Sequence, residues 1–254
     1  MNPVKHIPNI ITSMNLLCGV MGVIFTMADR LDTAFLCMLA AAVFDFCDGL
    51  AARLLKAYSD IGKELDSLCD VVSFGVLPAL MLFKLYTPDS ASAFFGQPVW
   101  RIVLSFFPLL IAVFSALRLA KFNLDERQQD AFLGLPTPAA AMICGSLACF
   151  VARSPESFLA AWSAGPVFIP LLSLCICALL VSEIPMFAMK FGGGEQADFK
   201  TTAQRIAFLT LVVLAVIFVA LLRLDGSLVF LLSFTAYVVM NLLFLFAPSD
   251  KSRA

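Results

Sequence analysis

Long stretches without a charged side chain constrain this sequence more than any other feature. Asp, Glu, Lys and Arg are absent from eight runs, residues 7–28, 33–44, 71–83, 102–117, 131–152, 157–182, 206–222 and 226–249. A helix needs about 20 predominantly apolar residues to cross the hydrocarbon core of a bilayer. The chain is 61% hydrophobic and 14% charged, whereas soluble domains carry roughly 25% charged residues. The pattern predicts an all-α integral membrane protein, a bundle of about eight transmembrane helices that forms one domain over residues 1–254.

Two of these runs, 33–44 and 71–83, are too short to span a bilayer alone. Each reaches the required length only as a longer helix, of about 32–55 and 65–86, that continues into the stretch "FDFCDGLAARLLKAYSDIGKELDSLCD" at residues 44–70. The carboxylates of this stretch are therefore expected near the ends of two consecutive helices, with a short reversal of the chain between them.

The distribution of Lys and Arg predicts the orientation in the membrane. With the N-terminus inside, 12 of the 17 basic residues fall on the inner side and five on the outer side. Both termini and the carboxylates are then expected to face the cytoplasm, in the cytoplasmic membrane. The charged segment 119–135 should lie on that surface, and residues 190–205, which include a Gly triplet, should form a hinge. A net charge of −1 offers no basic surface for nucleic acid.

Four of the carboxylates occur at spacings that place them in pairs. On a helix, Asp45 and Asp48 are separated by about 60° of rotation, and Asp66 and Asp70 by about 40°, so each pair shares one face. Four carboxylates at the edge of a low-dielectric region cannot all stay ionised unless cations neutralise them. Oxygen ligands of this kind suit Mg²⁺ or Mn²⁺, and two such ions are the usual arrangement for displacement at phosphorus. The alternative is that these are solvated helix-end charges paired with nearby Arg and Lys side chains.

Small and polar residues follow the first pair. Gly49 and Ala52 lack bulk and would let a flat ring or a pyrophosphate approach the backbone, although small residues also occur at plain helix contacts. Arg53 supplies a planar guanidinium suited to a phosphate, and Ser59 supplies a hydroxyl in the turn. The eight cysteines show no zinc spacing with the only histidine and are expected to be buried apolar residues.

The carboxylates and the small residues together form a longer pattern that resembles the signature of the CDP-alcohol phosphatidyltransferase family. The fixed residues are Asp45-x-x-Asp48-Gly49-x-x-Ala52-Arg53 and, after eight further residues, Gly62-x-x-x-Asp66-x-x-x-Asp70. The preceding segment "PNIITSMNLLCG", which starts at Pro8, is similar to the first helix of that family.

This resemblance implies a membrane transferase that takes CDP-diacylglycerol from the bilayer and passes its phosphatidyl group to an alcohol, with release of CMP. It implies two divalent ions, Mg²⁺ or Mn²⁺, held by Asp45, Asp48, Asp66 and Asp70, and gives Asp70 the further role of general base. It assigns CDP-diacylglycerol binding to Asn9, Thr12, Gly49, Ala52, Arg53 and Ser59. Family members are usually homodimers.

Three later segments are similar to family members that use L-serine as the acceptor, "RLAKFN" (118–123), "FLGLPTPAAA" (132–141) and "VSEIPMFAMKF" (181–191). The last one differs at Glu183 and Met186, where an Arg-like and a Thr-like residue are expected. A phosphorylated acceptor, glycerol 3-phosphate or inositol phosphate, would require a basic cluster beside Asp70, and the candidate cations there are few. Serine is therefore expected, with Arg118 or Lys121 on its carboxylate and Arg118 favoured for its bidentate geometry, although both could simply be positive-inside anchors.

An ion-coupled transporter is the alternative outside the family. It would require an inverted repeat with a second charged or broken helix in the other half of the chain. Nothing in residues 131–249 mirrors residues 45–70, which argues against this interpretation.

Overall fold

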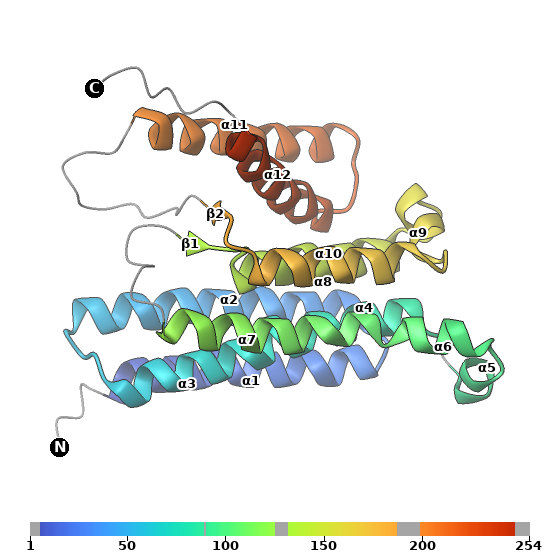
Figure 1. Cartoon of the computed structure of the whole chain (residues 1–254), viewed down its shortest axis with the longest axis horizontal. Coiled ribbons are helices and arrows are strands. Elements are labelled where there is room, and N and C mark those ends of the chain that lie inside the picture. The colour runs from blue at the N-terminus through green and yellow to red at the C-terminus, as the bar shows by residue number, and fades with distance from the viewer. Residues whose placement is uncertain (1–5, 89, 125–131, 187–198, 247–254) are drawn as a thin grey trace.

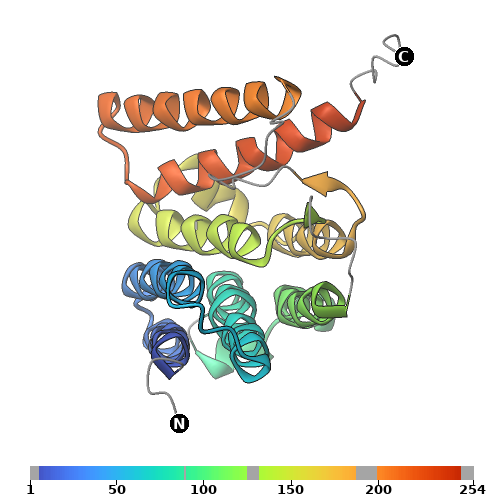
Figure 2. The same ribbon diagram turned by 90° about the vertical axis from the view of Figure 1, so that its left-hand side faces the viewer.

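The computed structural model describes residues 6–88, 90–124, 132–186 and 199–246, and these residues form helices stacked in tiers (Figures 1 and 2). The first tier holds α1 (Ile7–Met27), α2 (Leu31–Leu54), α3 (Asp60–Asp70), the π-helical segment η2 (Val71–Val76), α4 (Leu77–Tyr86), α5 (Ala91–Phe95), α6 (Val99–Ser105), the short 3₁₀ turn η3 (Phe107–Leu109) and α7 (Leu110–Leu124). The second holds α8 (Thr137–Arg153), α9 (Phe158–Ser163) and α10 (Phe168–Val181), and the third holds α11 (Phe199–Leu221) and α12 (Ser227–Phe246).

The helices have the lengths and compositions of membrane spans, as predicted. Five in the described chain are long and apolar enough to cross a bilayer, namely Ile7–Met27, Leu31–Leu54, Asp60–Tyr86, Val99–Leu124 and Ser227–Phe244. Three shorter apolar helices cover Thr137–Arg153, Phe168–Val181 and Ile206–Leu221. Each of the eight charge-free runs thus contains a helix, and the prediction of an all-α integral membrane fold is confirmed.

Two details of the predicted helices differ in the structure. The third helix begins at Asp60 rather than near residue 65, because the Ser59 hydroxyl caps it by accepting a hydrogen bond from the Gly62 N–H at 3.1 Å. The run 102–117 is not one regular helix. It is interrupted after Ser105 by the turn that contains Pro108, which cannot donate the backbone hydrogen bond that a continuous helix needs.

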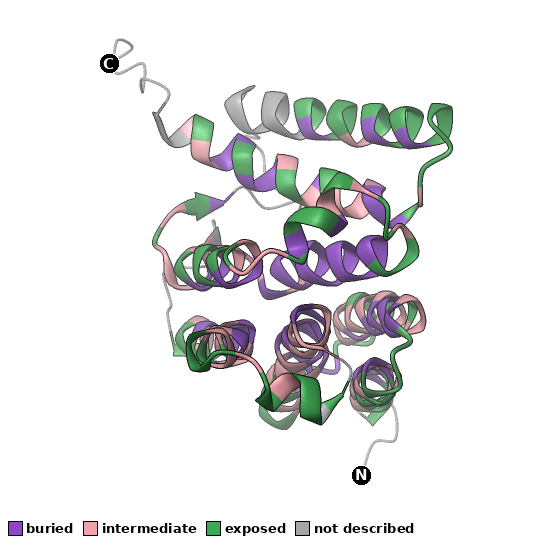
Figure 3. Ribbon diagram, turned by 90° about the vertical axis from the view of Figure 1, so that its right-hand side faces the viewer, coloured by how far each residue is buried: buried purple, intermediate pink, exposed green. Residues whose placement is uncertain are grey.

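The core of the bundle is centred on α8, where residues 139–151 are all buried (Figure 3). Small side chains along α8 let its neighbours approach closely, as expected at helix contacts in a membrane. At Gly145, a Cβ atom would lie 2.6 Å from Cε of Met38 in α2. The first and second tiers are therefore packed directly against each other where α2 meets α8.

The described chain also contains a short pair of β-strands, which was not predicted. The two-residue strands β1 (Phe132–Leu133) and β2 (Pro185–Met186) pair in antiparallel fashion. Next to them Gly134 has a positive φ of 77°, and its N–H donates to the Ile184 carbonyl at 2.9 Å. The Leu135 N–H donates to the Leu179 carbonyl, also at 2.9 Å. These bonds fix the start of α8 against the end of α10. The predicted hinge lies mostly outside the described residues, since α11 begins at Phe199.

Candidate active site

The end of α2 and the first half of α3 bring three of the four predicted carboxylates together. Asp45, Asp48 and Asp66 each offer an oxygen atom, and these atoms lie within 4.8 Å of one another. Asp48 is only 6% exposed, and Asp45 and Asp66 are half-buried. The convergence follows from the helical spacing predicted above and from the short reversal between Leu54 and Asp60.

This cluster has the properties of a cation site. Oδ2 of Asp48 and Oδ1 of Asp66 are buried and have no hydrogen-bond partner, and an unpaired buried carboxylate oxygen is strongly unfavourable. A divalent ion would offset the repulsion between the carboxylates and give these two oxygens a partner. Mg²⁺ and Mn²⁺ prefer donor sets made of oxygen atoms alone. The three residues therefore fit a metal ion. The alternative, that they are solvated helix-end charges paired with Arg or Lys, does not fit, because within the described residues none of the three forms such a salt bridge.

Asp70 lies one turn further along α3 and is 7% exposed. It is outside the group of three but interacts electrostatically with Asp45, Asp66 and Arg118. Its Oδ1 accepts a hydrogen bond from Nδ2 of Asn15 in α1 at 3.1 Å. The fourth carboxylate thus lies one helical turn from the cluster, near enough for its charge to interact with the cluster and with Arg118.

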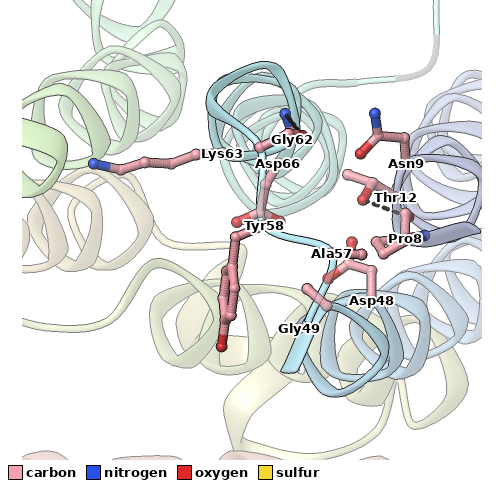
Figure 4. A pocket seen from close by; sticks show the side chains of 12 residues that line it. Pro8, Asn9, Thr12, Asp48, Gly49, Ala57, Tyr58, Gly62, Lys63 and Asp66 are labelled. Carbon is pink, nitrogen blue, oxygen red and sulfur yellow. Dashed lines mark hydrogen bonds between the residues drawn. The ribbon is translucent and has the colours of Figure 1, made fainter. Parts of the chain in front are cut away.

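A cavity of about 170 Å³ opens beside the carboxylates (Figure 4). Its lining comes from the start of α1, the end of α2, the turn that follows and the start of α3, and consists of Pro8, Asn9, Thr12, Asp48, Gly49, Ala52, Ala57, Tyr58, Ser59, Gly62, Lys63 and Asp66. Five of the six predicted CDP-diacylglycerol contacts are in this set. The cavity therefore joins the first-helix residues to the carboxylates, as the sequence pattern predicts.

Two glycines shape the cavity in different ways. A Cβ atom at Gly49 would meet nothing within 4 Å, so the absence of a side chain there leaves open space beside Asp48. A Cβ atom at Gly62 would lie 2.9 Å from the Ser59 hydroxyl oxygen and 3.0 Å from Oδ1 of Asn9. Glycine at 62 therefore permits the close approach of α1 to the start of α3.

Arg53, the sixth predicted contact, is placed differently. It is exposed, does not line the cavity, and its Nε donates to the Gly49 carbonyl on its own helix at 3.0 Å. Lys63, which the sequence interpretation treated only as a counter-charge, extends from the cavity wall toward α7 (Figure 4). Its ammonium donates to the Asn123 carbonyl at 3.2 Å.

The two residues predicted to bind the acceptor alcohol, Arg118 and Lys121, differ sharply in burial. Arg118 in α7 is 7% exposed, and its guanidinium donates to Oγ1 of Thr137, at the start of α8, at 2.9 Å. Its Nε is buried without a partner, and the group also interacts electrostatically with Asp70 and with Tyr237 of α12. Lys121 is exposed. A buried guanidinium with a free donor beside a carboxylate is suited to bind an anion, so Arg118 is the stronger candidate.

Asn15, Thr137 and Tyr237 were missed as site residues by the sequence interpretation. Asn15 and Thr137 lie within segments that carried the family resemblance, but their side-chain partners are distant in sequence. Tyr237 lies in a predominantly apolar run whose few polar residues form no motif.

Sequence comparison agrees with this geometry. The sequence model of the CDP-alcohol phosphatidyltransferase family matches residues 5–171. The chain belongs to this family. All of the predicted site residues lie inside the matched range.

Named relatives within the family extend the similarity. The chain is 30% identical over 194 residues to the CDP-diacylglycerol–serine O-phosphatidyltransferase of Bacillus subtilis (strain 168), which covers 76% of this chain and 97% of the relative. It is 33% identical over 191 residues to the protein of the same name from Mycobacterium leprae (strain TN), which covers 72% of this chain and 58% of that relative. An archaetidylserine synthase from Methanothermobacter thermautotrophicus is 32% identical over 142 residues, or 55% of this chain and 56% of the relative. The chain thus spans nearly all of the first relative and little more than half of the other two.

Proposed function

We propose that this protein transfers the phosphatidyl group of CDP-diacylglycerol to the hydroxyl of L-serine and forms phosphatidylserine and CMP. The observation that carries the proposal is the convergence of Asp45, Asp48 and Asp66 beside an open cavity at the ends of membrane-spanning helices, with Asp70 one turn further along α3. The named relatives with the same activity support it. Residues 1–254 would act as one catalytic domain.

The cavity is assigned to the cytidine diphosphate group. Asn9 and Thr12 offer polar contacts from α1, and the open space at Gly49 and Ala52 accepts a flat or highly charged group. The acyl chains would remain in the bilayer, since the cavity lies at the ends of membrane-spanning helices. Ser59 remains a proposed contact, because a capping hydroxyl accepts one bond and can still donate another. Arg53 would have to leave its present bond to Gly49 to reach a phosphate.

In the proposed reaction the serine hydroxyl oxygen attacks the phosphorus that carries the diacylglycerol. The bond between this phosphorus and the oxygen of the CMP phosphate breaks, and CMP leaves with the electron pair. Asp70 accepts the hydroxyl proton, a role that requires the carboxylate to be within hydrogen-bond reach of the hydroxyl. Divalent ions held by Asp45, Asp48 and Asp66, with Asp70 as a further proposed ligand, would neutralise the phosphates and stabilise the leaving group. We propose two ions, Mg²⁺ or Mn²⁺.

Arg118 is assigned to the carboxylate of serine. Its unpartnered buried Nε and its position next to Asp70 would place the amino acid with its hydroxyl near the base. The charge of Arg118 interacts with that of Asp70. A single guanidinium suits a carboxylate better than the dianion of glycerol 3-phosphate or inositol phosphate, which remain the alternative acceptors.

The same proposal covers location and assembly. The protein is an integral membrane protein, and we assign it to the cytoplasmic membrane with the carboxylate cluster on the cytoplasmic side, on the basis of the Lys and Arg distribution. A homodimer is proposed from the family resemblance. Membership in an enzyme family argues against the transporter interpretation.

The test is an assay of the purified protein with CDP-diacylglycerol, Mg²⁺ or Mn²⁺, and serine, glycerol 3-phosphate or inositol phosphate in parallel. Release of CMP together with phosphatidylserine in the serine reaction is the expected result. Lipid product from either phosphorylated alcohol but not from serine would refute the choice of acceptor, and no CMP release with any alcohol would refute the activity.

A further inference from the structure

Asn15 is the residue that ties α1 to the candidate base. It is 0% exposed in the middle of α1, and its Nδ2 donates to Oδ1 of Asp70 at 3.1 Å. The two residues are 55 positions apart in the chain, so the bond is a direct link between helices at the depth of the proposed chemistry.

The backbone around Asn15 is locked to the same helix. The Ser73 hydroxyl, one turn beyond Asp70, donates to the Asn15 carbonyl at 3.1 Å. A Cβ atom at Gly19 would lie 2.3 Å from this hydroxyl oxygen, and one at Gly22 would lie 2.6 Å from Cδ2 of Leu77. These contacts bring α1 into close packing with Ser73 of η2 and Leu77 of α4. The Asn15 amide is consequently held at a fixed position relative to Asp70.

At a buried position with no role beyond packing, asparagine is energetically less favourable than an apolar residue. Its Oδ1 is buried and has no hydrogen-bond partner, and an unsatisfied buried polar group costs about 1–3 kcal/mol. An apolar residue of similar volume would avoid this penalty. The presence of asparagine therefore indicates a role for its N–H group, which is directed at Asp70.

An aspartate carboxylate rotates broadly about its terminal torsion and offers about four lone-pair sites on two oxygens. The Asn15 bond to Oδ1 restricts this rotation and so fixes the direction in which Oδ2 points. We infer that Asn15 is a positioning residue for Asp70, which orients the carboxylate toward the acceptor hydroxyl. The inference rests on the proposed function, in which Asp70 is the base.

The first variant is Asn15→Leu, which keeps the number and branching of the side-chain heavy atoms but has no donor. We expect kcat to fall roughly 100-fold, the size of effect that misplacement of a reacting group by about 1 Å produces, while the KM values for serine and CDP-diacylglycerol change little. Thermal stability should also change little, because loss of the bond is offset by removal of the orphaned amide oxygen. The matched control is Thr26→Val, which removes a buried hydroxyl bonded to the Gly22 carbonyl near the other end of α1 and should keep the wild-type kcat. Asn15→Ala, which only removes atoms, serves if the leucine variant does not fold.

A double-mutant cycle separates positioning from a general structural role. If Asn15 acts through Asp70, Asn15→Leu should cause no further loss of the residual rate in an Asp70→Asn background. Independent, multiplicative losses in the double variant would overturn the inference, and so would a wild-type kcat in Asn15→Leu. If wild-type protein used an acceptor other than serine, the proposed acceptor would fail, and the same cycle measured with that other acceptor would still decide the role of Asn15.

Discussion

Arg118→Ala removes the buried guanidinium beside Asp70 and tests the acceptor assignment directly. The lost interaction is a charged hydrogen bond to the serine carboxylate, which is worth about 1.5–3 kcal/mol. At about 1.36 kcal/mol for each factor of ten, KM for serine should rise roughly 10- to 150-fold. KM for CDP-diacylglycerol should change far less, because the cavity assigned to its cytidine diphosphate is lined by residues from α1, α2, α3 and the turn before α3 rather than by α7.

The measurement is a steady-state assay of CMP release with each substrate varied in turn. Ethanolamine, which is serine without its carboxylate, provides an internal comparison. In the wild-type protein kcat/KM should strongly favour serine, and Arg118→Ala should reduce this preference by the same factor by which it raises KM for serine. Thr137→Val is the control, since it removes the present partner of the guanidinium but keeps the positive charge, and should have a much smaller effect on the preference.

The result that would refute this reasoning is an unchanged ratio of serine to ethanolamine in Arg118→Ala. Equal increases in KM for both substrates would instead assign the guanidinium to a lipid phosphate.

Three further outcomes are expected. Asp45→Asn and Asp66→Asn should each abolish turnover and weaken Mn²⁺ binding to the purified protein, measured by calorimetry, and full wild-type activity in excess EDTA would contradict the metal site. Gly49→Leu should fold normally, because the added side chain enters open space, yet it should abolish CDP-diacylglycerol binding. The control is Gly226→Leu, at an equally open position in the turn before α12, which should bind CDP-diacylglycerol like the wild type. Gly134→Ala should lower the melting temperature in detergent. A positive φ costs a non-glycine residue about 1–3 kcal/mol, and the added Cβ would lie 2.7 Å from the Ser182 carbonyl oxygen. An unchanged melting temperature would show that this turn relaxes freely.

Local periodicity predicted that Asp45, Asp48 and Asp66 come together, although it also included Asp70, which lies outside this group of three. The spacing of Asp45 and Asp48 and the single turn from Asp66 to Asp70 fix which side chains share a helix face. Because only five residues separate α2 from α3, the two faces meet without any information about the rest of the fold. The same reasoning predicted the helical segments, since a bilayer permits few other ways to satisfy the backbone.

Contacts between distant segments could not be predicted in this way. The Asn15–Asp70 bond and the Arg118–Thr137 bond depend on how α1, α7 and α8 pack, and packing depends on close contacts such as that of Gly19 with Ser73. The short β1–β2 pair was also hidden, because two residues give no periodic signal. Sequence favoured Arg118 over Lys121 only for the bidentate geometry of its guanidinium, and it could not show that Arg118 is buried and Lys121 exposed.

The packing gives α3 a particular place in the proposed chemistry. One face of α3 carries Asp66 in the carboxylate cluster and, one turn or about 6 Å further along the axis, Asp70 as the base. The helix is held on one side by Asn15 of α1, and on the other by α7, where Lys63 donates to the Asn123 carbonyl and Asn123 donates to the Ser67 hydroxyl at 2.9 Å. Displacement at phosphorus requires the attacking and leaving oxygens to be roughly in line, so the groups that act on each must keep a fixed separation. A single helix anchored on both sides provides that separation without help from the lipid, and α7, which forms one of the two anchors, also carries Arg118. In the proposed function both substrates would therefore be positioned relative to the same helix.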